Sequence, residues 1–429
     1  MFASASRLDL GITVGYKRPS GVRTILSGPL PIFVEYSGVY GITDLPGYEY
    51  RNMRTAFEHH RDRVREISFK GSSADFDKFF EVTKCPFPVL ESLVLNVNNV
   101  ASELKPPDTF LGGPKLPDLH LRRLTIGRTL LASVSAFLSS ATDLTDLTLQ
   151  IDTVFGPSPE TSFLAYLRGM PYLRSLNLSI PNSAPSKSLS TLTTSEDIVP
   201  LSNLTRFYYV GHPVFLSALL AGFSAPSLWD VDFSFSDSIL SPIVHLPRFI
   251  SEMEGHYHIA QVTIAAATTS GSANGISFSL LTHSEPNSHS KPQFKLHDPG
   301  RFPASIMQIS RALSTRLTTI EELRITFGWL VGHSVSDNVV PWLGVFRYFP
   351  GVRVLRLESP RYDYMARTLD QGHEERNDLV LLPALEEIQL CKNLHFTNEI
   401  KRAHQLVTFQ PFVSAREQAG RPVKVFFRQ

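Results

Sequence analysis

The six residues LESLVL at positions 90–95 carry the pattern on which the fold depends: apolar, two variable, apolar, one variable, apolar. Its last four residues alternate with the period expected of a β-strand that has one buried face. Successive copies start 23 to 33 residues apart, apart from one gap of 61 residues, where we expect a degenerate repeat near GISFSLL (275–281). The other copies are VREISF (64–69), LRRLTI (121–126), LTDLTL (144–149), LRSLNL (173–178), LTRFYY (204–209), LWDVDF (228–233), IAQVTI (259–264), IEELRI (320–325), VRVLRL (352–357) and LEEIQL (385–390).

Segments with helical spacing of apolar residues lie between these hexads. A strand followed by a returning helix buries its apolar face only by stacking on neighbouring copies. The pattern therefore predicts an α/β fold: over residues 59–429, an irregular leucine-rich-repeat solenoid, or horseshoe, of about 11–12 repeats, with a parallel inner sheet and outer helices. The expected helices are FDKFFEVTK (76–84), LLASVSAFLSSA (130–141), ETSFLAYLRGM (160–170), PVFLSALLAGF (213–223) and PASIMQISRALSTRL (303–317).

Three stretches fall outside the repeat. Residues 1–58 contain one segment typical of a strand (30–37) and one typical of an amphipathic helix (50–62), and we expect them to form the N-terminal cap that a solenoid requires. Residues 181–197 and 282–293 are rich in Ser, Pro and Thr and low in apolar residues, which predicts mobile surface insertions.

Composition excludes several classes of partner and compartment. With 41 Lys+Arg against 40 Asp+Glu, the chain lacks the basic excess that nucleic-acid binding requires, so no nucleic acid is expected. Its 2 cysteines, Cys85 and Cys391, favour a reducing compartment. A signal peptide needs an unbroken apolar segment near the N-terminus, and Asp9 interrupts that segment here. No apolar run in the chain approaches the ~20 residues of a membrane span. We therefore expect a cytoplasmic or nuclear protein, or one present in both compartments, with no membrane partner.

The sequence shows no catalytic, cofactor or metal motif at diagnostic spacing, so the expected function is not enzymatic. The glycine-rich segments LGGP (111–114) and GSANG (271–275) lack the context of a phosphate-binding loop and are interpreted as turns. His245, His256 and His258 have no partner at ligand spacing, so no metal is predicted.

Alternation along each strand places the third and fifth residues of every hexad, and the seventh position that follows it, on the inner surface of the sheet. At ~4.8 Å per strand, eleven or twelve strands give an inner arc of about 50 Å, which suits a protein target rather than a small molecule. Tyrosine and arginine are the residue types here that concentrate binding energy at interfaces, so Tyr208 and the arginines are the first anchors to test. The candidate partner-binding residues on this concave face are Arg123, Arg206, Tyr208, Asp230, Asp232, Arg324 and Arg356.

Arg324 and Arg356 occupy the same position of consecutive expected strands and should project side by side. Two interpretations stay open. The pair is either part of a solvated charge network with nearby glutamates, or a forked donor for a carboxylate or phosphate on a partner. The nearby glutamates are Glu322, Glu358 and Glu387.

Five segments together resemble the F-box/leucine-rich-repeat proteins of mushroom-forming fungi, over roughly residues 25 to 395. They are GPLPIFVEYSG (28–38), HHRDRVREISF (59–69), FPVLESLVLN (87–96), APSLWDVDF (225–233) and FPGVRVLRLES (349–359). The resemblance implies the substrate-recognition part of an F-box subunit of a cullin-RING ubiquitin ligase, with the target held by the repeats.

The F-box itself is not visible. An F-box opens with a Leu-Pro-x-Glu signature and ends near a tryptophan, and residues 1–58 contain neither, the tryptophans being Trp229, Trp329 and Trp342. Two functions are therefore carried forward. One is target recognition for ubiquitin ligation, with the ligase adaptor as a second partner if an F-box lies upstream. The other is a stand-alone scaffold or inhibitor-like binding protein without a ligase.

Overall fold

A computed structural model of the chain divides into two compact units. Unit one comprises Met1–Ser186 and Ser195–Leu204, and unit two comprises Lys187–Thr194 and Thr205–Gln429. Both units are α/β, with mainly parallel strands and accompanying helices. The structure describes residues 31–37, 47–97, 106–107, 109–113, 120–153, 159–180, 198–235, 245–252, 258–269, 272–283, 293–297, 307, 309–311, 313–326, 342–358, 365–370, 381–391 and 406–428.

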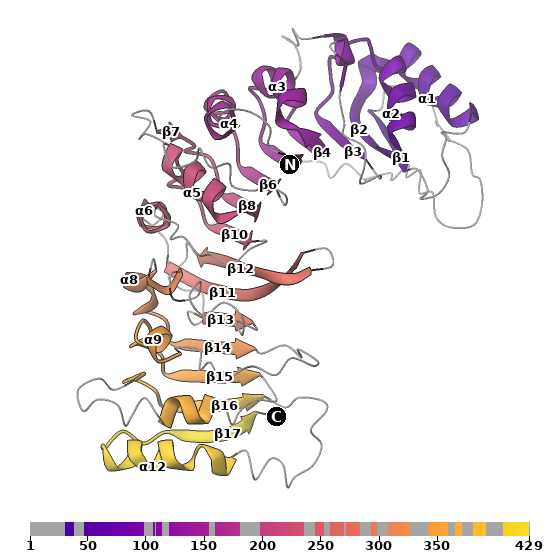
Figure 1. Cartoon of the computed structure of the whole chain (residues 1–429). Helices are drawn as coiled ribbons and strands as arrows, with labels where there is room; N and C mark the ends of the chain where they lie inside the picture. The colour runs from indigo at the N-terminus through magenta and orange to yellow at the C-terminus, as the bar shows by residue number, and fades with distance from the viewer. Residues whose placement is uncertain are drawn as a thin grey trace, which may run out of the picture. The chain divides into compact units, whose positions relative to one another are not determined.

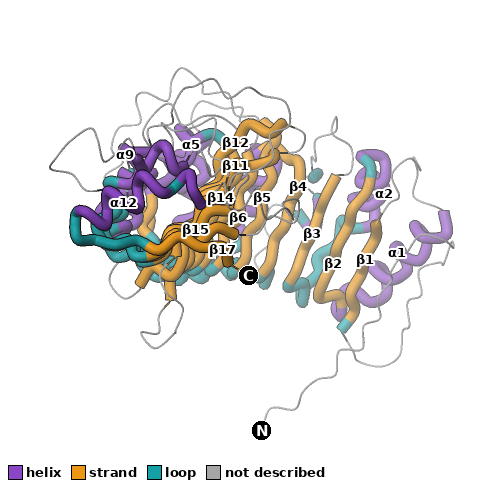
Figure 2. Tube along the Cα trace, turned by 90° about the horizontal axis from the view of Figure 1, so that it is seen from below, coloured by secondary structure: helices purple, strands orange, loops and turns teal. Residues whose placement is uncertain are grey.

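The sheet of unit one is parallel, and its strands follow one another in chain order. These are β1 (Ile32–Ser37), β2 (Val64–Gly71), β3 (Ser92–Val97), β4 (Arg123–Leu130), β5 (Asp146–Thr153) and β6 (Ser175–Ile180). Its helices lie on one side of the strands (Figures 1 and 2). They are α1 (Gly47–His60), α2 (Ser73–Val82), α3 (Leu131–Ser140) and α4 (Pro159–Arg168), with short 3-10 turns at Arg61–Arg63 and Phe110–Gly112 and a two-residue strand β7 (Val199–Pro200). The strand and helix expected in the N-terminal region are confirmed as β1 and α1.

The sheet of unit two has the order β8-β10-β12-β11-β13-β14-β15-β16-β17. Its strands are β8 (Arg206–Gly211), β10 (Asp230–Phe235), β11 (His258–Thr269), β12 (Ser272–His283), β13 (Gln293–His297), β14 (Glu322–Thr326), β15 (Val354–Glu358), β16 (Glu387–Cys391) and β17 (Lys424–Arg428). The other elements described in this unit are α5 (Pro213–Gly222), the two-residue β9 (Phe223–Ser224), α6 (Leu246–Glu252), α8 (Ser314–Leu317), α9 (Trp342–Phe346) and α12 (Gln410–Gln418).

In the long gap between hexads, the strand that the sequence predicts at 275–281 is present but runs antiparallel to its neighbours, and a parallel strand lies further along, at β13. Strands β11 and β12 form an antiparallel hairpin, and β12, which contains the predicted repeat at 275–281, pairs antiparallel with β10. Strand β11 therefore lies one strand further from β10 than expected. The predicted insertion at 282–293 overlaps the end of β12 and the first residue of β13, which the sequence analysis missed. The predicted insertion at 181–197 and residues 284–292 lie outside the described part of the chain.

Burial along the strands confirms the predicted side-chain alternation. In β6, Leu176 and Leu178 are fully buried whereas Ser175, Asn177 and Ser179 are half-buried. The same alternation recurs in β10 and β15. We call one side of the sheet the polar face: it carries the third and fifth residues of each hexad and the residue that follows the hexad. The opposite face packs apolar side chains into the core.

A turn precedes most hexads and fixes where each strand begins. The amide of the first hexad residue donates to the carbonyl three residues earlier, and that earlier residue is apolar and buried each time. The acceptors are Phe87, Ala141, Met170, Leu201, Ala225, Leu317, Phe349 and Leu382. These eight hexads are therefore the ends of a longer apolar pattern that includes the turn.

The second residue of the hexad joins consecutive strands through its backbone. The carbonyl of Glu91 accepts from the amides of Arg122 and Arg123, both at 2.9 Å. In unit two the carbonyl of Glu321 accepts from Arg353 at 2.8 Å and Val354 at 3.0 Å. These paired bonds hold neighbouring strands in the same register, so equivalent hexad positions line up in rows across the polar face.

Candidate interaction surface

The polar face of unit two carries straight rows of side-chain positions across nine strands. The strand registers connect the fifth hexad position of β8 to its equivalents on every later strand of the sheet. We call this line the middle row. In spatial order it consists of Tyr208, Asp232, Ser279, Thr263, Lys295, Arg324, Arg356, Gln389 and Phe426.

Four of the predicted partner-binding residues form one patch on β8 and β10. The register pairs Arg206 with Asp230 and Tyr208 with Asp232. The Tyr208 hydroxyl also donates a hydrogen bond diagonally to the Asp230 carboxylate. The pKa of Tyr208 is raised to about 12, chiefly by burial and then by the hydrogen bond to and the charge of Asp230. The phenol is therefore protonated at physiological pH and held as a fixed donor.

Trp229 borders this patch and was missed as a candidate. It precedes Asp230 at the second hexad position, and its side chain is 37% exposed. An exposed tryptophan is a common anchor at protein interfaces. The sequence could have identified Trp229, because the second hexad position is variable and does not point into the core.

The arginines predicted to project side by side are register partners. Arg324 on β14 pairs with Arg356 on β15, so their backbones are one strand spacing apart, ~4.8 Å. Glu322 Oε2 forms an ion pair with Arg356 Nη2 at 3.0 Å, and the two side chains are 3% and 19% exposed. Part of the predicted charge network is thus present, but as a largely buried pair rather than a solvated one.

Arg123 belongs to the polar face of unit one. Its register partners are Ser92 on β3 and Asp146 on β5, and its side chain is exposed. The Asp146 carboxylate accepts a hydrogen bond from the Thr145 hydroxyl at 2.8 Å. Arg123 therefore faces an oriented acidic neighbour within its own unit.

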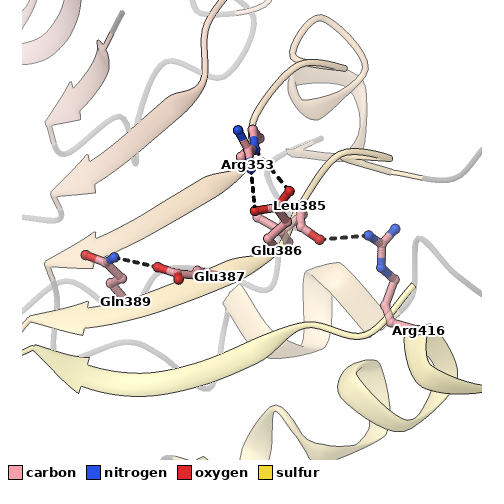
Figure 3. Close-up of polar contacts among 6 residues, drawn as sticks. All are labelled: Arg353, Leu385, Glu386, Glu387, Gln389 and Arg416. Atoms are coloured by element: carbon pink, nitrogen blue, oxygen red, sulfur yellow. Dashed lines mark hydrogen bonds and ion pairs between the residues drawn. The ribbon is translucent and has the colours of Figure 1, made fainter. Parts of the chain in front are cut away.

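Ion pairs also join second-position residues of consecutive hexads, outside the polar face. Arg65 and Glu91 lie 3.3 Å apart in unit one. In unit two the Arg353 guanidinium donates to both carboxylate oxygens of Glu386, at 3.0 and 2.9 Å (Figure 3). These contacts reinforce the backbone bonds of the same residues and are exposed, so each contributes little to stability.

Figure 3 also shows two contacts that orient side chains on and behind β16. On the polar face, Gln389 Nε2 donates to Glu387 Oε2 at 2.9 Å. Behind the strand, Arg416 of α12 is 3% exposed and donates through Nη2 to the carbonyl of Leu385 at 3.0 Å. Burial lowers the pKa of Arg416, the charge of Arg421 adding to the effect. Arg416 therefore anchors α12 to the turn that leads into β16.

The part of the chain that the structure describes contains no group of three or more His, Cys, Asp or Glu side chains arranged to hold a metal ion. Of the three histidines weighed as ligands, His256 and the side chain of His258 lie outside that part. Burial, with a contribution from the charge of Arg248, lowers the pKa of His245.

Among the described helices, none combines the length and apolarity needed to cross a membrane. A scan against models of known protein families found no match, and neither did a search of curated proteins.

Proposed function

We propose that this chain is a leucine-rich-repeat solenoid that acts as a non-catalytic protein-binding module, and that its target docks on the polar face. The observation that carries the proposal is the middle row, in which nine strands present aligned positions dominated by polar and charged residues. A row of this length offers a protein several simultaneous contacts, which suits a protein target better than a small ligand. On this proposal the protein is cytoplasmic or nuclear and binds neither nucleic acid nor membrane.

The resemblance to F-box/leucine-rich-repeat proteins specifies the proposal further. The bound protein would then be a substrate for ubiquitin ligation, and the chain would be the substrate-recognition part of a cullin-RING ligase subunit. Direct binding of the purified ligase adaptor at micromolar or tighter affinity would support this version.

A stand-alone scaffold or inhibitor-like protein is the second candidate, and one observation favours it. Within residues 31–63, the described segments form a strand that joins the sheet, a helix and a 3-10 turn, whereas an F-box is a compact helical module. Failure of the purified adaptor to bind the full 429-residue chain would favour this candidate.

The binding surface can be tested with matched variants of the full chain. Tyr208→Ala combined with Asp232→Asn changes the polar face, whereas Glu417→Gln removes one acidic charge at an exposed site on α12. Proteins retained from cell extract by each variant are quantified by mass spectrometry. We expect specific proteins to be lost only with the polar-face variant. Retention of the same set by all three chains would contradict docking at Tyr208 and Asp232.

A further inference from the structure

Charge is segregated along the middle row of unit two. Its β10 end carries Asp232, next to Asp230 on the same strand. Two strands with serine and threonine at the row position follow, and then three consecutive strands carry a cation at the same position. These cations are Lys295, Arg324 and Arg356. The formal net charge of the whole chain is only +1, yet residues of the same charge occupy neighbouring positions in this row, where like charges repel.

The cations line up across the strands but not along them. On β14 the polar-face residue before Arg324 is Glu322, and on β15 Arg356 is followed two residues later by Glu358. A segment laid across the strands along the middle row would meet Arg324 on β14 and Arg356 on β15 in succession, so charge complementarity favours an acidic segment in this direction.

The spacing of the row suits a helix. Neighbouring strands are ~4.8 Å apart, whereas side chains on one face of an extended peptide recur every ~6.6 Å. On a helix, residues at i, i+3 and i+4 lie about 5–6 Å apart, which matches the row much more closely. A carboxylate stripe along one helix face can therefore meet successive cations without distortion.

The Glu322 carboxylate sets the geometry of the site. At 3% exposure it faces Arg356, whose Nη2 lies 3.0 Å away, and it holds the guanidinium while about a fifth of the Arg356 side chain stays exposed. A held guanidinium loses less conformational freedom when it binds a second carboxylate. Glu322 is thus a positioning residue.

We propose that Arg324 and Arg356 of the middle row bind an acidic α-helix of a partner protein whose carboxylates recur at i, i+4 and i+7. This inference rests on the proposed function and specifies the chemistry of the docked segment. The glutamates beside the row at Glu322 and Glu387 disfavour a helix that is acidic all round, so a single acidic stripe is preferred.

The test uses the full chain and two fluorescein-labelled, alanine-rich helical peptides of identical composition. One carries its glutamates in an i, i+4, i+7 stripe, and the other distributes them around the helix. Fluorescence anisotropy should show at least tenfold tighter binding of the striped peptide, about 1.4 kcal/mol, and affinity should fall as salt rises. Equal binding of the two peptides, or binding of neither, would overturn the proposal.

Two variants and a control locate the binding. Arg324→Gln should weaken striped-peptide binding at least tenfold. Arg353→Gln removes the same charge from the residue just before β15, outside the polar face, and should change affinity less than twofold. Glu322→Gln keeps the side-chain shape but removes the ion pair that holds the Arg356 guanidinium, so a correctly folded variant should bind the striped peptide more weakly. If Glu322→Gln unfolds, the comparison of Arg324→Gln with Arg353→Gln still shows whether the striped peptide binds at the middle row.

The outcomes separate this inference from the proposed function. If Arg324→Gln leaves peptide binding and cellular partners unchanged while the Tyr208/Asp232 variant loses partners, the acidic-helix site is refuted and the interaction module stands. If no polar-face variant affects any partner, the proposed function itself fails.

Discussion

Replacing Leu176 with alanine tests the register of β6 and, through it, the assignment of the polar face. The Leu176 side chain is 0% exposed and pairs in register with Leu147 of β5. The substitution removes three carbon atoms, which at ~0.8 kcal/mol each lose about 2.4 kcal/mol of burial. A residual cavity of roughly 50 Å³ would add about 1.2 kcal/mol at ~24 cal/mol per Å³. The expected loss in the free energy of unfolding is therefore about 3.5 kcal/mol.

Asn177→Ala is the matched control, because the neighbouring residue is half-buried on the polar face. It should change the free energy of unfolding by no more than about 0.5 kcal/mol. Hydrogen exchange of peptides covering residues 173–180 measures local opening, and urea denaturation followed by far-UV circular dichroism measures the loss of the sheet. Equal destabilisation by the two substitutions would refute the register, since a slip of one residue exchanges the two faces.

Three further predictions concern unit two. Ultraviolet titration should show Tyr208 ionising near pH 12, and Asp230→Asn should lower the pKa of Tyr208 toward 10. Because the pKa of Tyr208 is raised in the folded protein, its contribution to stability is present below about pH 10 and is lost as pH rises toward about 12. Arg353→Ala breaks an ion pair whose side chains are 51% and 57% exposed, so a thermal melt should show a loss below about 1 kcal/mol. Arg416→Ala removes a buried donor to the Leu385 carbonyl and should cost about 1.5–3 kcal/mol, with faster hydrogen exchange at residues 382–391; unchanged exchange there would contradict the anchoring role of Arg416.

Strand positions could be predicted from the sequence because the apolar residues of each hexad are the ones that are buried. Leu93, Leu95 and their equivalents must face the core, so alternation locates each strand and assigns its faces. Arg324 and Arg356 could be placed side by side for the same reason. Equal positions in consecutive hexads become neighbours once the strands are parallel and in register.

Strand direction could not be read in the same way. Alternation of apolar and polar residues is identical in parallel and antiparallel strands, so GISFSLL satisfied the pattern while running opposite to its neighbours. The preceding turn does not reveal strand direction either. The hexad IAQVTI has His256 where eight other hexads have a buried apolar residue, but Arg61 and Asp118 occupy the same position before the parallel strands β2 and β4. Strand β13 was missed because its five residues adjoin a polar tract.

The Glu322–Arg356 ion pair bears on both the stability of the sheet and the proposed binding site. A largely buried ion pair must offset the desolvation of both charges, and apolar residues of similar volume often stabilise a fold equally well or better. Val354 occupies the position on β15 that is paired with Glu322, so an apolar residue is accepted in this row. On β14 the carboxylate instead offsets the charge of Arg356, so its removal would leave a largely buried guanidinium without this counter-charge. If the pair also serves the proposed acidic-helix site, Glu322→Gln and Arg324→Gln should both weaken binding of the striped peptide in correctly folded protein.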